Sequence, residues 1–292
     1  CCHLSRVKPV EVEFADALIS ALVLSAIVIL WATRPRLKPH VAINETHLSE
    51  LKELQQDLHE SELKTPNLVP GTEATIGFAN PDNPAKTELV FMYVHGFSAT
   101  WRETAPVAET LAKSFQANTL QCRLSGHGTG PEGMKCSAED WLISLNKQAQ
   151  IAARLGEKIV VIAVSTGAPL SVWLATQSGI KDKLACLLFM SPNFKIRPNL
   201  GFLLTGPFSS QLIRLLFAGR YRSWVPANED QAKFWTTKQP VSALIEMQKV
   251  VDWANAQDLE SIETPLATLY MPNDPTIDAK AAIRTHKRFS NV

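Results

Sequence analysis

Residues 158–170, KIVVIAVSTGAPL, constrain the fold more than any other stretch of the sequence. Lys158 precedes six aliphatic residues, and a short apolar run without polar alternation is typical of a strand buried on both faces of a parallel sheet. Ser165 follows this run directly, small residues come next, and 170–177 has helical character. The sequence therefore predicts a buried strand, a sharp turn that contains Ser165, and a helix.

The turn reads Ala163-Val164-Ser165-Thr166-Gly167, which differs by one residue from the G-x-S-x-G pattern of a nucleophile elbow. Such a turn forces the serine into a strained backbone conformation, so the residues around it must be small. Ala163 adds one methyl group and still meets this requirement. These five residues alone are equally compatible with an ordinary strand-to-helix turn that contains a serine.

The composition excludes several classes of protein. Twenty-nine basic and 28 acidic residues give a formal net charge of +1, so the charge does not favour nucleic acid as a partner. The five cysteines are too few for a disulfide scaffold and lack C-x-x-C spacing. A Cys122–Cys136 bridge is conceivable outside the cytosol, but we expect buried free thiols. We expect no bound cofactor and no metal.

The N-terminal segment, 1–37, contains the uncharged apolar stretch 17–33, ALISALVLSAIVILWAT. Extended back to residue 14, the stretch reaches about 20 residues, near the minimum for a bilayer span. Trp31 lies where an interfacial aromatic residue of an anchor is expected. We therefore predict an N-terminal transmembrane helix, a membrane partner and a membrane-anchored protein. A cleaved signal peptide, which implies a secreted or periplasmic protein, and a buried core helix are the alternatives.

The segment 38–73 is polar and contains a predicted amphipathic helix at 47–63. Its leucines, at positions 48, 51, 54 and 58, follow the spacing of one helical face. We interpret 38–73 as a linker whose helix packs on the following domain or stands between that domain and the membrane.

From residue 74 onward, predicted strands alternate with helices, which indicates an α/β fold with a mostly parallel, doubly wound sheet. The region 193–262 interrupts the alternation with an apolar helical insert that contains no predicted strand. The strands are expected at 89–94, 117–124, 158–164, 184–190 and 265–271, and the main helices at 104–115, 138–155, 170–177 and 278–289.

Four motifs occur in order at the ends of these predicted strands: Y-V-H-G-F at 93–97, R-L-S-G-H-G-T at 123–129, the Ser165 turn, and N-D at 273–274. Together they resemble the α/β-hydrolase fold, and more narrowly its lysophospholipase, monoglyceride lipase and serine aminopeptidase-like group of carboxylesterases. The resemblance covers 74–292. It implies one hydrolase domain with the insert at about 193–262 as a lid.

The resemblance implies a serine hydrolase in which the Ser165 hydroxyl attacks a carbonyl carbon and forms an acyl-enzyme. Two backbone N–H groups must then face the carbonyl oxygen, and one such donor contributes roughly 3 kcal/mol. The family pattern assigns these oxyanion donors to Phe97 and Thr166. Gly96 permits the close backbone approach that this arrangement needs.

The remaining motif residues are interpreted as supports of the site. We expect His95 to fix its loop without transferring protons, and His127 to be structural. Neither histidine has a carboxylate or thiol at metal-ligand spacing, which argues against a metal site. The supporting residues are His95, Gly96, Arg123, Gly126, His127, Gly128 and Gly167.

The resemblance assigns the acid of the catalytic triad to Asp274, and we interpret Asp278 as the N-cap of the next helix. The family places the histidine of the triad beyond one more strand, but the sequence ends at Val292. His286 lies inside the predicted helix, on a face expected to be solvated. We therefore expect a truncated chain that lacks its catalytic base and has little activity. A natural protein without the base is the other explanation.

The composition of the lid indicates the expected class of substrate. Its apolar side chains can roof an acyl-chain pocket, and there is no acidic cluster to bind an amine, so we expect a lipid-like carboxylic ester. A peptidase, an acyltransferase and a non-catalytic binding module remain as alternatives. The lid residues meant here are Phe202, Leu203, Leu204, Phe208, Leu212, Leu215 and Phe217.

Overall fold

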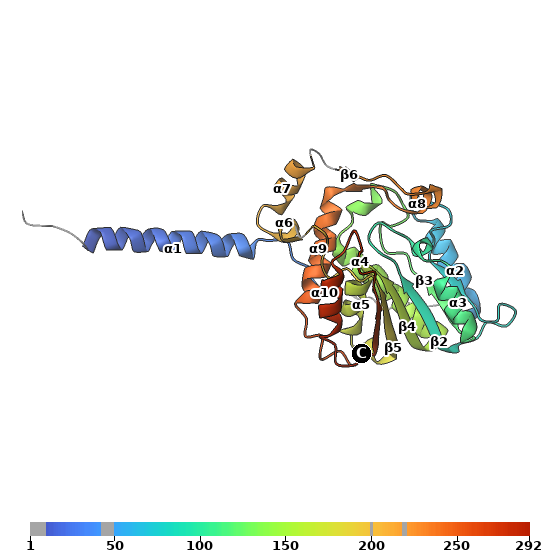
Figure 1. Ribbon diagram of the computed structural model, residues 1–292. Helices are drawn as coiled ribbons and strands as arrows, with labels where there is room; N and C mark the ends of the chain where they lie inside the picture. Colours follow the sequence, from blue (N-terminus) through green and yellow to red (C-terminus); the bar gives the residue numbers. More distant parts are fainter. Residues whose placement is uncertain (1–9, 42–49, 199–200, 218–220) are drawn as a thin grey trace, which may run out of the picture.

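The computed structural model describes residues 10–41, 50–198, 201–217 and 221–292 (Figure 1). Its centre is a six-stranded sheet with the strand order β1-β3-β2-β4-β5-β8. β1 pairs antiparallel with β3, and the other neighbours pair in parallel. The predicted α/β architecture with a mostly parallel sheet is thus confirmed. The strands are β1 (Thr75–Gly77), β2 (Thr87–Val94), β3 (Asn118–Gln121), β4 (Gly156–Val164), β5 (Leu184–Met190) and β8 (Leu266–Leu269).

Helices cover both faces of the sheet because the central strands are apolar on both faces. Along β2, Val90 and Met92 enter the larger core with α4 and α5, whereas Phe91 and Tyr93 pack with α3 on the opposite side. These helices are α3 (Val107–Ser114), α4 (Ala138–Leu155) and α5 (Gly167–Ala175), and α10 (Ala279–His286) follows β8. Cys122 and Cys136 are free thiols, as expected.

The N-terminal helix α1 (Val10–Ala32) extends away from the sheet (Figure 1). A bilayer span needs about 20 predominantly apolar residues, but the apolar part of α1 starts only after Asp16 and ends with the helix. Among the described residues, no helix combines the length and the apolar character needed to cross a membrane. The predicted transmembrane helix and the membrane-anchored localisation are therefore wrong.

The polar segment before the sheet contains α2 (Leu51–Leu63), which packs on the domain. Leu54 and Leu58 are buried in the large core, and Glu62 forms a two-point ion pair with Arg123 in the loop after β3. The start of the predicted helix, at 47–49, lies outside the described residues. Upstream, the carbonyl oxygen of Pro39 accepts a hydrogen bond of 2.9 Å from the Trp173 indole.

Most of the insert forms a layer above the carboxyl ends of the strands, whereas its last helix, α9, packs beside α5 on the main core (Figure 1). Contrary to the expectation of a purely helical insert, it contains a two-stranded antiparallel sheet. Each of these strands has three residues, which is too short for an alternating pattern to be recognised in the sequence. The insert contains α6 (Gly201–Thr205), α7 (Ser209–Leu216), β6 (Tyr221–Ser223), α8 (Glu229–Phe234), β7 (Lys238–Pro240) and α9 (Val241–Asn255).

Candidate active site

Ser165 lies in the sharp turn between β4 and α5. Its φ of 49° lies in the left-handed region, which an ordinary residue adopts only when the surrounding structure enforces it. Two backbone hydrogen bonds enforce it here: Ser165 N–H donates to the Met190 carbonyl at 3.0 Å, and its own carbonyl accepts from Asn193 N–H at 2.9 Å. The end of β5 and the segment directly after it thus hold the serine in a strained conformation.

The turn packs closely against the loop after β2, and two glycines make this approach possible. A Cβ atom on Gly167 would lie 2.3 Å from the carbonyl oxygen of Val94. A Cβ on Gly96 would lie 3.1 Å from the Cβ of Ser165. Any side chain at Gly167 would therefore displace the turn or the end of β2.

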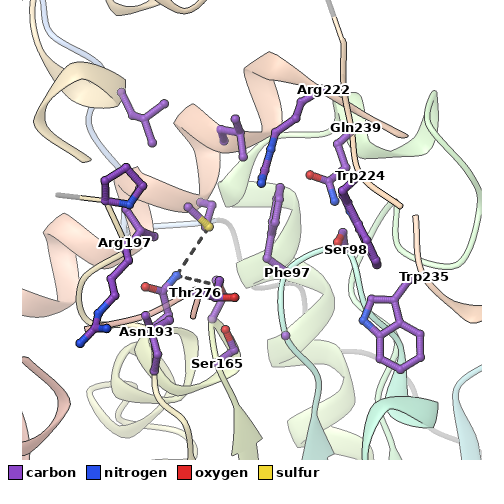
Figure 2. Close-up of a pocket in the computed structure, with 18 of the residues that line it drawn as sticks. Phe97, Ser98, Ser165, Asn193, Arg197, Arg222, Trp224, Trp235, Gln239 and Thr276 are labelled. Atoms are coloured by element: carbon purple, nitrogen blue, oxygen red, sulfur yellow. Dashed lines mark hydrogen bonds between the residues drawn. The ribbon is translucent and has the colours of Figure 1, made fainter. Parts of the chain in front are cut away.

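A cavity of about 920 Å³ opens between the strand ends and the insert (Figure 2). Its walls combine apolar side chains of α6, α7 and α9 with polar side chains of the β6–β7 region. The structure brings predicted residues from three separate segments together in its lining: Gly96, Phe97, Ser165, Thr166 and Asp274.

The backbone N–H groups of Phe97 and Thr166 donate no hydrogen bond to any other described residue. The Phe97 ring is held by two aromatic neighbours, with ring centroids 6.5 Å from His127 and 6.2 Å from Trp141. The side chain of Asn193 donates to the Thr166 hydroxyl at 3.2 Å. Both amide groups are therefore free in a well-packed region of the cavity lining.

Glu103, which the sequence did not single out, also lines the cavity. Its Oε1 accepts hydrogen bonds from Gly96 N–H at 2.7 Å and from the Tyr93 hydroxyl at 3.1 Å. Burial raises the pKa of this carboxyl to about 7. Glu103 thus fixes the backbone one residue before Phe97. Its only sequence signal was its place, seven residues after Gly96, in a loop that follows a strand.

His95 connects the loops after β2 and β3. Its Nδ1 donates to the Gly96 carbonyl at 2.9 Å, and its Nε2 accepts from Leu124 N–H at 3.1 Å. This pattern requires the neutral ring, and burial lowers the pKa of His95 to about 4. Burial likewise holds the pKa of His127 well below its ordinary value. The two rings therefore act as neutral packing and hydrogen-bonding groups.

The glycines of the loop after β3 occupy positions that other residues cannot. Gly126 and Gly128 have φ values of 73° and 68°. A Cβ on Gly126 would lie 2.2 Å from the Gly133 carbonyl oxygen, and one on Gly128 would lie 2.4 Å from the Thr72 hydroxyl. Arg123 anchors the start of this loop through its pair with Glu62, so the motif is a rigid support beside the cavity.

Asp274 follows β8 and is 9% exposed. Its Oδ1 accepts from the N–H groups of Thr276, at 2.8 Å, and Ile277, at 3.0 Å. Within the described residues, its Oδ2 accepts no hydrogen bond, so one oxygen remains available to a group in the cavity. The prediction that Asp278 caps the following helix is confirmed, because its side chain accepts from Lys280 and Ala281 N–H.

None of the described residues that line the cavity is a histidine. His286 lies on α10, half-buried, with Nδ1 3.1 Å from the Thr268 hydroxyl of β8. Across the described part of the chain, no three His, Cys, Asp or Glu side chains are placed to hold a metal ion. The chemistry available in the cavity therefore rests on the serine, the two carboxyls and the free amides.

Comparison with known proteins identifies the fold. A metagenome-derived lipolytic enzyme, from a study of LipS and LipT, superposes with a TM-score of 0.63 at 17% identity, over 77% of this chain and 86% of its own. The monoacylglycerol lipase of Paleococcus ferrophilus superposes with a TM-score of 0.54 at 18% identity, over 75% and 85%.

A soluble variant of the monoglyceride lipase of Saccharomyces cerevisiae gives a TM-score of 0.51 at 11% identity, over 75% of this chain and 78% of its own. No family model matches the sequence, and the search of curated proteins finds no match. The topology and these neighbours together show that the chain has the α/β-hydrolase fold.

Proposed function

We propose that this protein is a serine hydrolase of carboxylic esters that acts through an acyl-enzyme on Ser165. The observation that carries the proposal is the convergence of three chain segments on one cavity: the strained Ser165 turn, the free amide groups of Phe97 and Thr166, and the Asp274 carboxyl. The structural neighbours, a lipolytic enzyme and two monoglyceride lipases, support the same reaction class.

In the proposed reaction, the Ser165 Oγ attacks the ester carbonyl carbon, and negative charge develops on the carbonyl oxygen. The N–H groups of Phe97 and Thr166 stabilise this oxyanion, each by roughly 3 kcal/mol. Collapse of the tetrahedral species breaks the bond to the alcohol, which leaves with a proton, and water then releases the acid. A general base must accept the serine proton in the first step and return it to the alcohol.

We assign Asp274 as the acid of the triad, the partner of the general base. A carboxylate beside a histidine orients the ring and stabilises its cation. The free Oδ2 of Asp274 supports this assignment. The base itself is the part of the triad that the described cavity lining does not contain. Under this proposal, the described lining supplies the nucleophile, the oxyanion donors and the acid, but not the proton acceptor.

The apolar wall of the cavity supports a lipid-like ester as substrate. Leu204, Ile213 and Leu244 form a small core of the insert and also face the cavity. An acyl chain placed along this wall would lose its contact with water, at about 25 cal/mol per Å² of apolar surface buried. A lysophospholipase, monoacylglycerol or short carboxylic ester type of reaction fits such a wall.

One observation favours a second candidate. Because no described cavity residue is a histidine, the protein could bind lipid-like esters without hydrolysing them. A serine without a base is a weak nucleophile. In that case the fold supplies a binding pocket and no turnover.

Hydrolysis of p-nitrophenyl butyrate with and without added imidazole separates the two candidates. For the hydrolase, imidazole supplies the base, and the rate above that of the buffer rises with imidazole in the unmodified protein and in Ser178→Ala. Ser178 is exposed and lies outside the cavity. Ser165→Ala should lose this rise. Equal rates in Ser165→Ala and in the unmodified protein would refute the hydrolase and favour the binding module.

A further inference from the structure

The cavity has a polar side that the ester chemistry does not use. This side is formed by the paired strands β6 and β7 of the insert, which α8 separates in sequence and which are called the β6–β7 hairpin below. The hairpin is fixed to the loop after β2, because Thr236 N–H, just before β7, donates to the Ser98 carbonyl at 2.8 Å. Figure 2 shows that Arg222 and Gln239 point from the hairpin toward the ring of Phe97. The hairpin therefore lies within reach of a substrate whose ester group is at Ser165.

Arg222 and Gln239 face each other across the two strands of the hairpin. Because side chains alternate along a strand, their neighbours point to the other face. Tyr221 on that face donates its hydroxyl hydrogen to the Glu132 carboxylate, outside the cavity. The hairpin thus anchors one face on the domain and presents the Arg222–Gln239 pair on the other.

Both side chains of the pair have unused hydrogen-bonding capacity. Gln239 is 2% exposed, and its Nε2 donates to the Thr236 carbonyl at 2.9 Å, but its buried Oε1 has no partner. Among the described residues, no acceptor or carboxylate pairs with the Arg222 guanidinium. Buried polar atoms are normally hydrogen-bonded, so the unpartnered Oε1 of Gln239 indicates a ligand. The Arg222 guanidinium is exposed and is therefore free to bind that ligand.

The charges of the cavity lining favour an anion at this side over the floor of the cavity, which is the part of the lining around the Ser165 turn. The acidic side chains among the described lining residues are Glu103, which bonds to Gly96 beside the Ser165 turn, and Asp274, in the loop after β8. Arg197, the other cationic lining residue, points away from Ser165 and Phe97 in Figure 2. A negative group would therefore be repelled by Asp274, and by Glu103 at a pH above its pKa of about 7, and attracted by Arg222. The guanidinium of Arg222 has a fork of donors suited to an oxyanion.

We propose that Arg222 and Gln239 form a head-group subsite for an oxyanion, phosphate or carboxylate, that carries a neighbouring hydroxyl or N–H group. Arg222 donates to the oxyanion, and Gln239 Oε1 accepts from the neighbouring donor. This inference rests on the proposed function for the position of the ester, and it narrows the substrates to esters with one acyl chain and an anionic head group. The acyl chain lies along the apolar wall of α6 and α7.

The test measures binding without turnover. Trp224 and Trp235 line the cavity, so their fluorescence can report ligand binding. Ser165→Ala protein is titrated, below the critical micelle concentration, with three ethers that contain no ester: 1-O-octylglycerol, its 3-phosphate, and 3-O-octylglyceric acid. We expect at least one of the two anionic ethers to bind 10-fold or more tightly than octylglycerol. The anion that gains more identifies the head group.

In the Ser165→Ala background, Arg222→Gln should reduce this preference to less than threefold, and Arg222→Lys should retain part of it. Arg214→Gln is the matched control, because Arg214 lies on α7 of the same insert but does not line the cavity, and it should keep the full preference. Equal affinity for all three ethers, or a preference that survives Arg222→Gln, would overturn the subsite. Because the ligands contain no ester, a failure of hydrolysis leaves this result unaffected.

Discussion

The floor of the cavity, around the Ser165 turn, and its roof, formed by the insert, are built in different ways. At the floor, close backbone contacts fix Ser165, and the residues of α5 behind it are all buried. In the roof, α7 buries Ser209 and Ile213 but leaves Leu215 80% exposed. The floor is therefore positioned by packing that tolerates little change, whereas the roof can vary its side chains. We infer that the floor determines the reaction and the roof determines the substrate.

The difference in packing explains how the strain at Ser165 is maintained. A left-handed serine costs about 1–3 kcal/mol. The strands β4 and β5 offset this cost because their side chains pack into the cores on both faces of the sheet. No comparable strand supports the α6–α7 part of the roof among the described residues. Substitutions in the two regions should therefore differ strongly in their effect on stability.

The largest expected effect is that of Gly167→Ala at the floor. The new methyl group would meet the Val94 carbonyl oxygen, so the free energy of unfolding should fall by about 3 kcal/mol. Urea denaturation followed by circular dichroism measures the change. Gly179→Ala is the matched control, because a Cβ at Gly179 meets no atom within 4 Å; its effect should stay within about 0.5 kcal/mol. Equal effects would contradict the account of the turn.

A smaller effect, with a defined pH dependence, is expected for Glu103→Gln. The folded protein keeps this carboxyl protonated up to a pKa of about 7, whereas the unfolded chain releases the proton near 4.5. Stability from this group is therefore full below pH 4.5 and is lost as the pH rises to 7. Because the carboxyl borders the solvent of the cavity, we expect a loss of about 2 kcal/mol.

The glutamine variant should avoid this loss, since its amide oxygen can still accept from Gly96 N–H. Its free energy of unfolding should equal that of the unmodified protein at pH 4.5 and exceed it by about 2 kcal/mol at pH 8. Urea denaturation at both pH values checks the difference. A constant offset between the two proteins would show that Glu103 does not titrate in this range.

The smallest effect is expected in the roof, for Leu215→Ala. This side chain is 80% exposed, so its removal should change the free energy of unfolding by less than about 0.5 kcal/mol. Ile213→Ala, two residues away and 3% exposed, is the comparison within the same helix and should cost more. Thermal or urea denaturation of both variants decides the point. A large cost at Leu215 would indicate that the roof is packed as tightly as the floor.

The floor could be predicted from sequence because its signals are local. The run of aliphatic residues before Ser165 and the helix after it are contiguous in the chain, and α4 was predicted with its observed bounds. The roof was harder, because β6 and β7 are very short. The Arg222–Gln239 pair joins positions 17 residues apart through tertiary structure, and Glu103 ends a three-residue 3-10 helix, Trp101–Glu103, that is too short for its sequence to predict. The prediction of an N-terminal membrane anchor was wrong because it extended the apolar stretch back past the charged residue Asp16 to reach the length of a span.

The most direct test of the central claim is mass spectrometry after reaction with p-nitrophenyl butyrate. The protein is incubated with the ester and imidazole, quenched with acid, and digested. We predict a butyryl group on the peptide that contains Ser165, and no such group in Ser165→Ala. A butyryl group on another residue, or none on the Ser165 peptide, would contradict the assignment of Ser165 as the nucleophile.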